Sequence, residues 1–329
     1  MAETDLVLEG GGVKGLGLVG AVTRLMEAGY TFERIAGTSV GSIVGALVAG
    51  GAGVKEIGAI MGRLEFERVS DRGPLGLPLA AETFNLLFER GAYAGDYIHG
   101  WVREELAQLG VTTFASLRRT DPGDDKNRSR ESRHKLVVMV SDVTRGRLLR
   151  LPWDYELIGL KADEQLVADA VRASMSIPLY FEPVTLRDAK AREDLTLVDG
   201  GLLSNFPIEA FDRTDGETPR WPTFGVKIIP SLPRDARQLF PVLGLPALPA
   251  VRLLQQVLAT AIVGRDQTHL ERPCVRRRTI EVDTRSVGIV EFDADEAKRK
   301  GLIRNGAQAA QGFLDRWDWE AYKADCRDG

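Results

Sequence analysis

Cysteine is scarce in this sequence. Cys274 and Cys326 are the only two among 329 residues, and their spacing matches neither a metal-binding pattern nor a disulfide framework. A chain of this length could bury about 75% of its unfolded surface in one globule, so it needs no covalent staples. We therefore expect a protein of a reducing compartment, with no disulfide framework, no metal site and no cofactor.

The sequence also lacks an excess of basic residues. Its 43 Lys and Arg residues are outnumbered by 47 Asp and Glu residues, which gives a formal net charge of −4 at pH 7. Because nucleic-acid-binding domains are usually basic, this balance argues against a nucleic-acid partner. The densest basic run is Arg276-Arg277-Arg278, which we interpret as a solvated turn before a strand.

No continuous apolar segment is long enough to span a bilayer. The most apolar long stretch, residues 239–264, is interrupted by three prolines and by Arg252, Gln255 and Gln256. The N-terminal sequence MAETDLVLEGGG runs directly into the first expected strand and does not resemble a signal peptide. The sequence therefore predicts a cytoplasmic protein without a transmembrane segment.

Two interpretations of the stretch 239–264 stay open. Its second half, 250–263, has the apolar spacing of a core helix, which a proline-rich connector would precede. Alternatively, the connector 239–249 exposes its apolar side chains as a flap beside the site. Such a flap would bring the protein into transient, peripheral contact with a membrane surface.

Glycine is concentrated at the front of the chain, where 13 of the 35 glycines lie at or before Gly53. Apolar runs and helical spacing predict elements in the order strand 5–8, helix 14–28, strand 34–36, helix 39–51, strands 136–143, 196–198 and 223–229, and helix 294–314. The βαβα beginning predicts an α/β fold with a mostly parallel central sheet and helices on both faces. We expect one domain over 1–329, with a cap near 63–96 and a mobile loop at 120–135.

The first glycine cluster, LVLEGGGVKGLG at 6–17, has two interpretations. Gly10, Gly12 and Gly15 match the G-x-G-x-x-G spacing of a dinucleotide-binding turn between a strand and a helix. The same loop could instead direct backbone N–H groups at the oxyanion that forms during ester cleavage. The spacing of this motif alone does not decide between the two anions.

Two further motifs favour the second interpretation. IAGTSVGS at 35–42 contains G-x-S-x-G as Gly37, Ser39 and Gly41, the pattern of a nucleophilic serine on a strained turn between strand and helix. LTLVDGGLLSNFPI at 195–208 places Asp199 at the end of an apolar strand, where a carboxylate with a raised pKa could accept the serine proton. Each motif also has a plain structural interpretation, a serine N-cap and an Asx turn.

Together the three motifs resemble the patatin-like phospholipase family. The resemblance rests on EGGGVKG at 9–15, GTSVG at 37–41 and DGG at 199–201, and extends to AVRASMSIPLYFEPV at 170–184 and SVGIVEFD at 286–293. Two departures are mild, since Glu9 stands where the family often has Asp and Lys14 where it often has Arg. A dinucleotide fold would leave the second and third motifs as coincidences, and its acidic residue after the second strand is missing.

The resemblance implies a patatin-like three-layer fold and a serine–aspartate dyad that hydrolyses acyl esters of phospholipids or other lipids. Ser39 would be the nucleophile and Asp199 the proton acceptor, while Gly10, Gly11 and Gly12 would form the oxyanion hole. The supporting motif residues would be Lys14, Gly15, Gly37, Gly41, Gly200 and Gly201. Lys14 would brace the loop or add positive field to the site, or it faces solvent on a helix.

Three alternatives remain open at this point. Ser39, Asp199 and His269 follow the chain order of an α/β-hydrolase triad, although His269 lies in a charged helical stretch. An acyl transferase with a serine elbow would likewise pair the serine with a histidine. A lipid-binding relative without catalysis is the most remote alternative, because both dyad residues are present.

Overall fold

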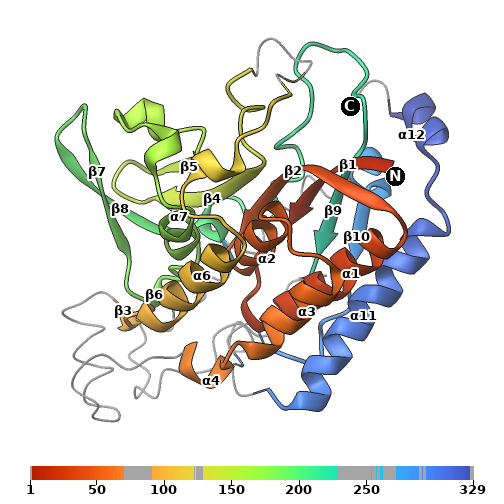
Figure 1. The fold of residues 1–329 in the computed structure, drawn as a ribbon, viewed down its shortest axis with the longest axis horizontal. Helices are drawn as coiled ribbons and strands as arrows, with labels where there is room; N and C mark the ends of the chain where they lie inside the picture. The colour runs from red at the N-terminus through yellow and green to blue at the C-terminus, as the bar shows by residue number, and fades with distance from the viewer. Residues whose placement is uncertain are drawn as a thin grey trace.

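The computed structural model describes residues 2–69, 91–121, 123, 129–228, 253, 257, 260–261, 272–288, 291 and 294–326. Its centre is an eight-stranded sheet in the order β10-β9-β1-β2-β4-β8-β7, with β5 paired to β4. The strands are β1 (Ala2–Leu8), β2 (Tyr30–Thr38), β4 (Leu136–Asp142), β5 (Arg147–Leu151), β7 (Val184–Asp188), β8 (Glu193–Asp199), β9 (Thr223–Lys227) and β10 (Thr279–Glu281). Figure 1 shows this sheet running through the molecule.

One side of the sheet is parallel and the other is antiparallel. β10, β9, β1, β2 and β4 pair in parallel, whereas β5, β8 and β7 join through antiparallel pairings. β4 is buried along its whole length, as expected of an apolar strand with both faces covered. A second, two-stranded sheet pairs β3 (Gly91–Tyr93) with β6 (Leu179–Phe181).

Helices cover the two faces unequally. The face that carries Leu6 and Leu8 forms the main core, to which several of the described helices contribute, among them α1 (Leu16–Glu27), α2 (Val40–Ala49), α3 (Val54–Arg63), α6 (Asp96–Gln108), α7 (Val167–Ser174) and α11 (Glu296–Leu314). The opposite face, which carries Val7, packs against Trp153 and Phe206. It also packs against Val275, a residue of the short helix α10 (Pro273–Arg277). The predicted α/β architecture with helices on both faces is confirmed.

The close packing that the glycine-rich front predicts is visible between α1 and α11, which lie side by side (Figure 1). A methyl group at Gly20 would lie 1.9 Å from the Ile303 carbonyl oxygen, and one at Gly306 would lie 2.0 Å from the Gly17 carbonyl oxygen. The two helix backbones therefore touch directly, which only glycine permits at these positions.

The strands and helices expected before residue 70 and after residue 294 are present. The observed strands are longer than expected, and the observed helices are shorter. Residues 70–90 of the expected cap lie outside the described residues, and its ends form α4 (Phe66–Val69) and β3. Within the loop expected at 120–135, Ser132 and His134 are buried. Residues 239–249, the expected flap, lie outside the described residues. In the described part of the chain, no helix has both the length and the apolarity to cross a membrane.

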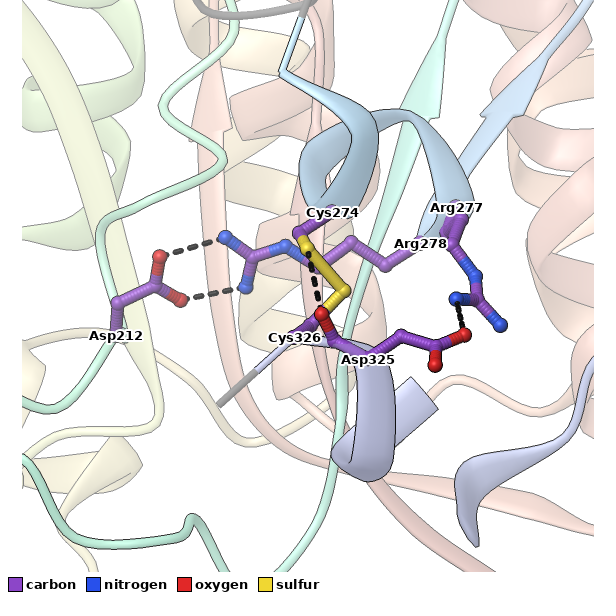
Figure 2. The surroundings of a disulfide bond; sticks show 6 residues. All are labelled: Asp212, Cys274, Arg277, Arg278, Asp325 and Cys326. Carbon is purple, nitrogen blue, oxygen red and sulfur yellow. Dashed lines mark hydrogen bonds and ion pairs between the residues drawn. A yellow bond between two sulfur atoms is a disulfide. The ribbon is translucent and has the colours of Figure 1, made fainter. Parts of the chain in front are cut away.

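The expectation that the cysteines form no disulfide is wrong. Cys274 of α10 and Cys326, directly after α12 (Trp319–Asp325), are joined in a disulfide with their Cα atoms 5.6 Å apart (Figure 2). No local pattern predicts this pairing, because 52 positions separate the two cysteines. They meet because α11 runs back along the sheet and returns the C-terminus to α10.

The interpretation of the basic run as a solvated turn before a strand is only partly right, because Arg276 and Arg277 are exposed but end α10, and Arg278, the turn residue before β10, is buried. Arg277 is the last residue of α10 and pairs with Asp325, while the buried Arg278 binds Asp212 through both terminal nitrogens, at 2.5 and 2.6 Å. Figure 2 shows these two ion pairs on either side of the disulfide. The Arg277–Asp325 pair and the disulfide join α12 to α10, and the Arg278–Asp212 pair joins the residue after α10 to the segment around Asp212.

Replacing Cys326 with serine is expected to lower the free energy of unfolding by up to about 4 kcal/mol, because the disulfide closes a long loop in the unfolded chain. The exposed Arg277–Asp325 pair cannot compensate, since exposed ion pairs contribute little. Urea unfolding with and without a reductant measures the difference. Reductant should destabilise the wild type to the level of the variant and leave the variant unchanged; a wild type that is insensitive after full reduction would contradict this expectation.

Candidate active site

The motif residues meet because β4 brings the ends of β2 and β8 to the same level of the sheet, Thr38 opposite Met139 and Asp199 opposite Val140. Gly10 comes two residues after the end of β1, and Ser39 comes directly after β2, which pairs with β1 in parallel. Asp199 is the last residue of β8 and lies opposite Val140 of β4. The carboxyl ends of parallel strands are the usual place for a ligand site in an α/β fold.

Ser39 has a strained backbone. Its φ of 52° and ψ of −127° lie in a region that residues other than glycine rarely adopt. The surrounding structure fixes this conformation, because the Ser39 N–H donates to Ser174 Oγ at 2.9 Å and the Ser39 carbonyl accepts from Ser42 Oγ at 2.6 Å. The residue is the N-cap of α2 and only 5% exposed.

The glycines on either side of Ser39 allow the strand and the helix to approach. A methyl group at Gly37 would lie 2.4 Å from the Gly41 carbonyl oxygen, and one at Gly41 would lie 2.4 Å from the Leu8 carbonyl oxygen. Backbone atoms cannot yield as a flexible side chain can. The small residues of the motif are therefore required by the tight turn, as the sequence predicts.

Asp199 is buried and has an unusually high pKa. Burial raises the pKa of its carboxyl group to about 7, against hydrogen bonds from the Gly201 N–H and the Ser39 side chain, which lower it. The Gly201 N–H lies 2.7 Å from Asp199 Oδ1. A methyl group at Gly200 would lie 2.2 Å from the Met139 carbonyl oxygen, so this glycine lets the turn pack against β4. A serine hydroxyl bonded to a carboxyl group that titrates near pH 7 is suited to proton transfer.

The glycine loop lies against Ser39, but its three N–H groups are not equivalent. A methyl group at Gly10 would lie 3.1 Å from Ser39 Cβ, which places the loop beside the hydroxyl. The Gly10 N–H already donates to the Asn205 carbonyl oxygen at 3.1 Å. Gly12 has a φ of 56°, which glycine adopts readily, and Gly15 packs against Val40 of α2. Within the described residues, the N–H groups of Gly11 and Gly12 have no hydrogen-bond partner.

Asn205 is a part of the site that the sequence interpretation missed. Besides its backbone contact, its side chain donates from Nδ2 to the Gly10 carbonyl oxygen at 3.2 Å. Its Oδ1 would meet a methyl group placed at either Gly10 or Gly201. Asn205 therefore joins the first and third motifs. The sequence feature that could have indicated Asn205 is its position six residues after Asp199, within the third motif LTLVDGGLLSNFPI at 195–208.

Lys14 braces the glycine loop, and the alternative that it faces solvent is wrong. The side chain is 8% exposed and donates from Nζ to the Thr284 carbonyl oxygen at 3.0 Å. Burial lowers the pKa of its amino group. Glu9, at the start of the loop, is also buried and forms an ion pair with Lys227 at 2.6 Å. The loop is thus held from β9 and from the segment after β10.

Two of the three histidines are engaged elsewhere. His99 pairs with Asp169 and His134 with Asp163, each at 2.8 Å, and neither contacts Ser39 or Asp199. His269, the histidine of the alternative triad, lies outside the described residues. Within the part of the chain that the structure describes, no cluster of three or more His, Cys, Asp or Glu residues could hold a metal ion.

Comparison with known proteins gives three findings. The sequence model described as patatin-like phospholipase matches residues 6–212. The uncharacterized protein YqhO of Bacillus subtilis is 32% identical over 320 residues, which cover 96% of this chain and 99% of that protein. Lysophospholipase nte1 of Aspergillus niger is 51% identical over 52 residues, only 16% of this chain and 3% of that one.

Among solved structures, the chain is similar to one in the heterodimeric ExoU-SpcU complex from the type III secretion system of Pseudomonas aeruginosa. The TM-score is 0.50 at 17% identity, with 95% of this chain and 51% of that chain covered. This similarity concerns the fold alone.

Proposed function

This chain belongs to the patatin-like phospholipase family, and we propose that it hydrolyses carboxylic ester bonds of lipids with a Ser39–Asp199 dyad. The observation that carries the proposal is that the strained Ser39 lies beside the buried Asp199 carboxyl group, whose pKa burial raises to about 7 while the Ser39 side chain lowers it. The family and its lysophospholipase-named relative support a lipid substrate. Phospholipids and lysophospholipids are the substrates we favour.

In the first half of the proposed reaction, Ser39 Oγ attacks the ester carbonyl carbon while the Asp199 carboxylate accepts the hydroxyl proton. The tetrahedral oxyanion accepts hydrogen bonds from the N–H groups of Gly11 and Gly12, for which the described residues supply no partner. Gly10 serves to position the loop, because its N–H is already bonded to Asn205. The C–O bond then breaks, and the alcohol leaves with the proton from Asp199.

In the second half, a water molecule attacks the acyl-enzyme carbonyl and gives its proton to Asp199. The second tetrahedral intermediate uses the same N–H groups. When it collapses, the fatty acid is released and the proton returns to Ser39 Oγ. Each step requires only the dyad and the loop, and Asp199 must be ionised at the start of each half-reaction.

Transient contact with a lipid surface is part of this proposal. Leu253 and Val257, four positions apart and both in helical conformation, are 61% and 55% exposed. Apolar side chains exposed on one face of a helix suit contact with a lipid surface. Their exposure argues against a core helix at these two positions of 250–263, whereas the connector 239–249, where we expect the flap, lies outside the described residues.

The experiment that tests this function is a hydrolysis panel with wild-type protein and the Ser39→Ala variant. The substrates are lysophosphatidylcholine, vesicles of phosphatidylcholine and soluble p-nitrophenyl butyrate. We expect the wild type to release fatty acid from at least one of the lipids and the variant to release none. A folded wild-type protein that hydrolyses none of the three esters, or a variant as active as the wild type, would contradict the proposal.

A further inference from the structure

One short segment contacts the backbone of both dyad residues. This segment, 172–176, spans the last turn of α7 and the residues that follow it. α7 packs against α2, β4 and β8, the elements that carry or adjoin Ser39 and Asp199. In Figure 1, α7 lies beside the carboxyl end of β4.

Ser174 is the contact to the nucleophile. Its side chain is fully buried, and its Oγ accepts the Ser39 N–H at 2.9 Å while donating to the Met139 carbonyl oxygen at 2.7 Å. Because the hydroxyl proton is committed to Met139, the lone pairs of Oγ are directed towards Ser39. The hydroxyl thus links the strained turn to β4.

Ser176 is the contact to the proton acceptor. Its backbone carbonyl accepts the Asp199 N–H at 2.8 Å. Arg172 holds Ser176 in turn, since its Nη1 donates to Ser176 Oγ at 2.6 Å and its Nη2 donates to the Glu182 carbonyl oxygen at 3.1 Å. The side chains of Arg172, Ser174 and Ser176 are all buried. Two residues on one rigid turn therefore fix the separation of Ser39 and Asp199.

We propose that Ser174 is a positioning residue that holds Ser39 in its strained conformation and so keeps its hydroxyl directed at Asp199. The inference rests on the proposed function of the dyad. Without the Ser174 hydroxyl, the Ser39 N–H would be buried without a partner. The turn would then lower its free energy by rotating the Ser39 backbone towards an unstrained φ and ψ. A displacement of about 1 Å of a reacting group can reduce a rate by roughly 100-fold.

The test compares Ser174→Ala with wild type, using p-nitrophenyl butyrate for steady-state kinetics and a fluorophosphonate for the rate of Ser39 labelling. We expect kcat to fall by roughly 10- to 100-fold with KM nearly unchanged, and the labelling rate to fall in parallel. Ser174→Thr, which keeps the hydroxyl, should recover most of kcat. A kcat and labelling rate at the wild-type level in folded Ser174→Ala would overturn the proposal.

Ser132→Ala is the matched control, because it removes another buried hydroxyl that donates to a backbone carbonyl, away from the dyad. It should keep wild-type kcat per folded molecule; equal losses in both variants would reduce Ser174 to a general packing role and overturn the proposal. If Ser174→Ala does not fold, Ser174→Cys fills the same space with a weaker acceptor and must show the lowered kcat. Ser39→Ala, run alongside, separates the two claims: an active Ser39→Ala refutes the dyad itself.

Discussion

Replacing Ser39 with alanine is expected to lower ester hydrolysis by roughly four to six orders of magnitude, while the protein stays folded. The change removes the oxygen that would form the acyl-enzyme. It leaves the contacts of the Ser39 N–H and carbonyl with Ser174 and Ser42 in place. The measurement is kcat/KM on a soluble ester together with the melting temperature of both proteins.

Ser39→Gly is the informative control for this first prediction. Glycine adopts a φ of 52° without the steric cost that serine has there, so this variant should be more stable than the wild type by about 1 kcal/mol. It should be as inactive as Ser39→Ala. An inactive Ser39→Gly variant with a raised melting temperature would show that the wild-type turn keeps a strained backbone that catalysis requires. Substantial hydrolysis by either variant would place the nucleophile elsewhere.

Replacing Asp199 with asparagine is expected to produce the second large effect, a loss of nearly all hydrolysis at every pH. Asparagine keeps the size of the side chain but cannot accept the Ser39 proton. In the wild type, burial raises the pKa of the Asp199 carboxyl group to about 7. Because the proton acceptor must be ionised, wild-type kcat/KM should rise with pH and reach half of its maximum near pH 7.

The same substitution should raise stability at high pH. In the unfolded chain Asp199 has its ordinary pKa near 3.8, so between pH 3.8 and 7 the folded state binds one more proton than the unfolded state. Stability of the wild type is therefore lost as pH rises through this window, by on the order of 4 kcal/mol. Asp199→Asn should match the wild type near pH 4 and exceed it at pH 8 in urea unfolding.

His269→Ala is the matched control for Asp199. A dyad predicts that this variant retains most of its activity and the same pH dependence. Loss of activity equal to that of Asp199→Asn would instead indicate the triad. A wild-type rate that does not change between pH 5 and pH 9 would contradict the role of Asp199 as proton acceptor.

The sequence predicts the local parts of this site well, because each is encoded in a few adjacent residues. The turn at Ser39 needs small residues at positions 37 and 41 whatever the rest of the fold, so its motif can be recognised directly. The alternation of apolar runs and helical spacing predicts the parallel side of the sheet for the same reason. The position of Asp199 at the end of a strand follows from its apolar neighbours.

The parts that were missed or left open depend on residues that meet only after folding. Lys14 is buried because Thr284, 270 positions away, supplies its acceptor. The disulfide forms because α11 returns Cys326 to α10. The Gly10 N–H is engaged by Asn205, a contact across 195 positions that no local pattern specifies. The antiparallel strands β5 and β7 were missed because the apolar and polar residues of such short strands give a weak signal.

The most direct test of the central claim is to label the wild-type protein with a fluorophosphonate and locate the adduct by mass spectrometry. The account predicts a single adduct on Ser39, formed at a rate that rises with pH around a midpoint near 7 and absent from Ser39→Ala. An adduct on a different serine, formed at the wild-type rate in Ser39→Ala, would contradict it.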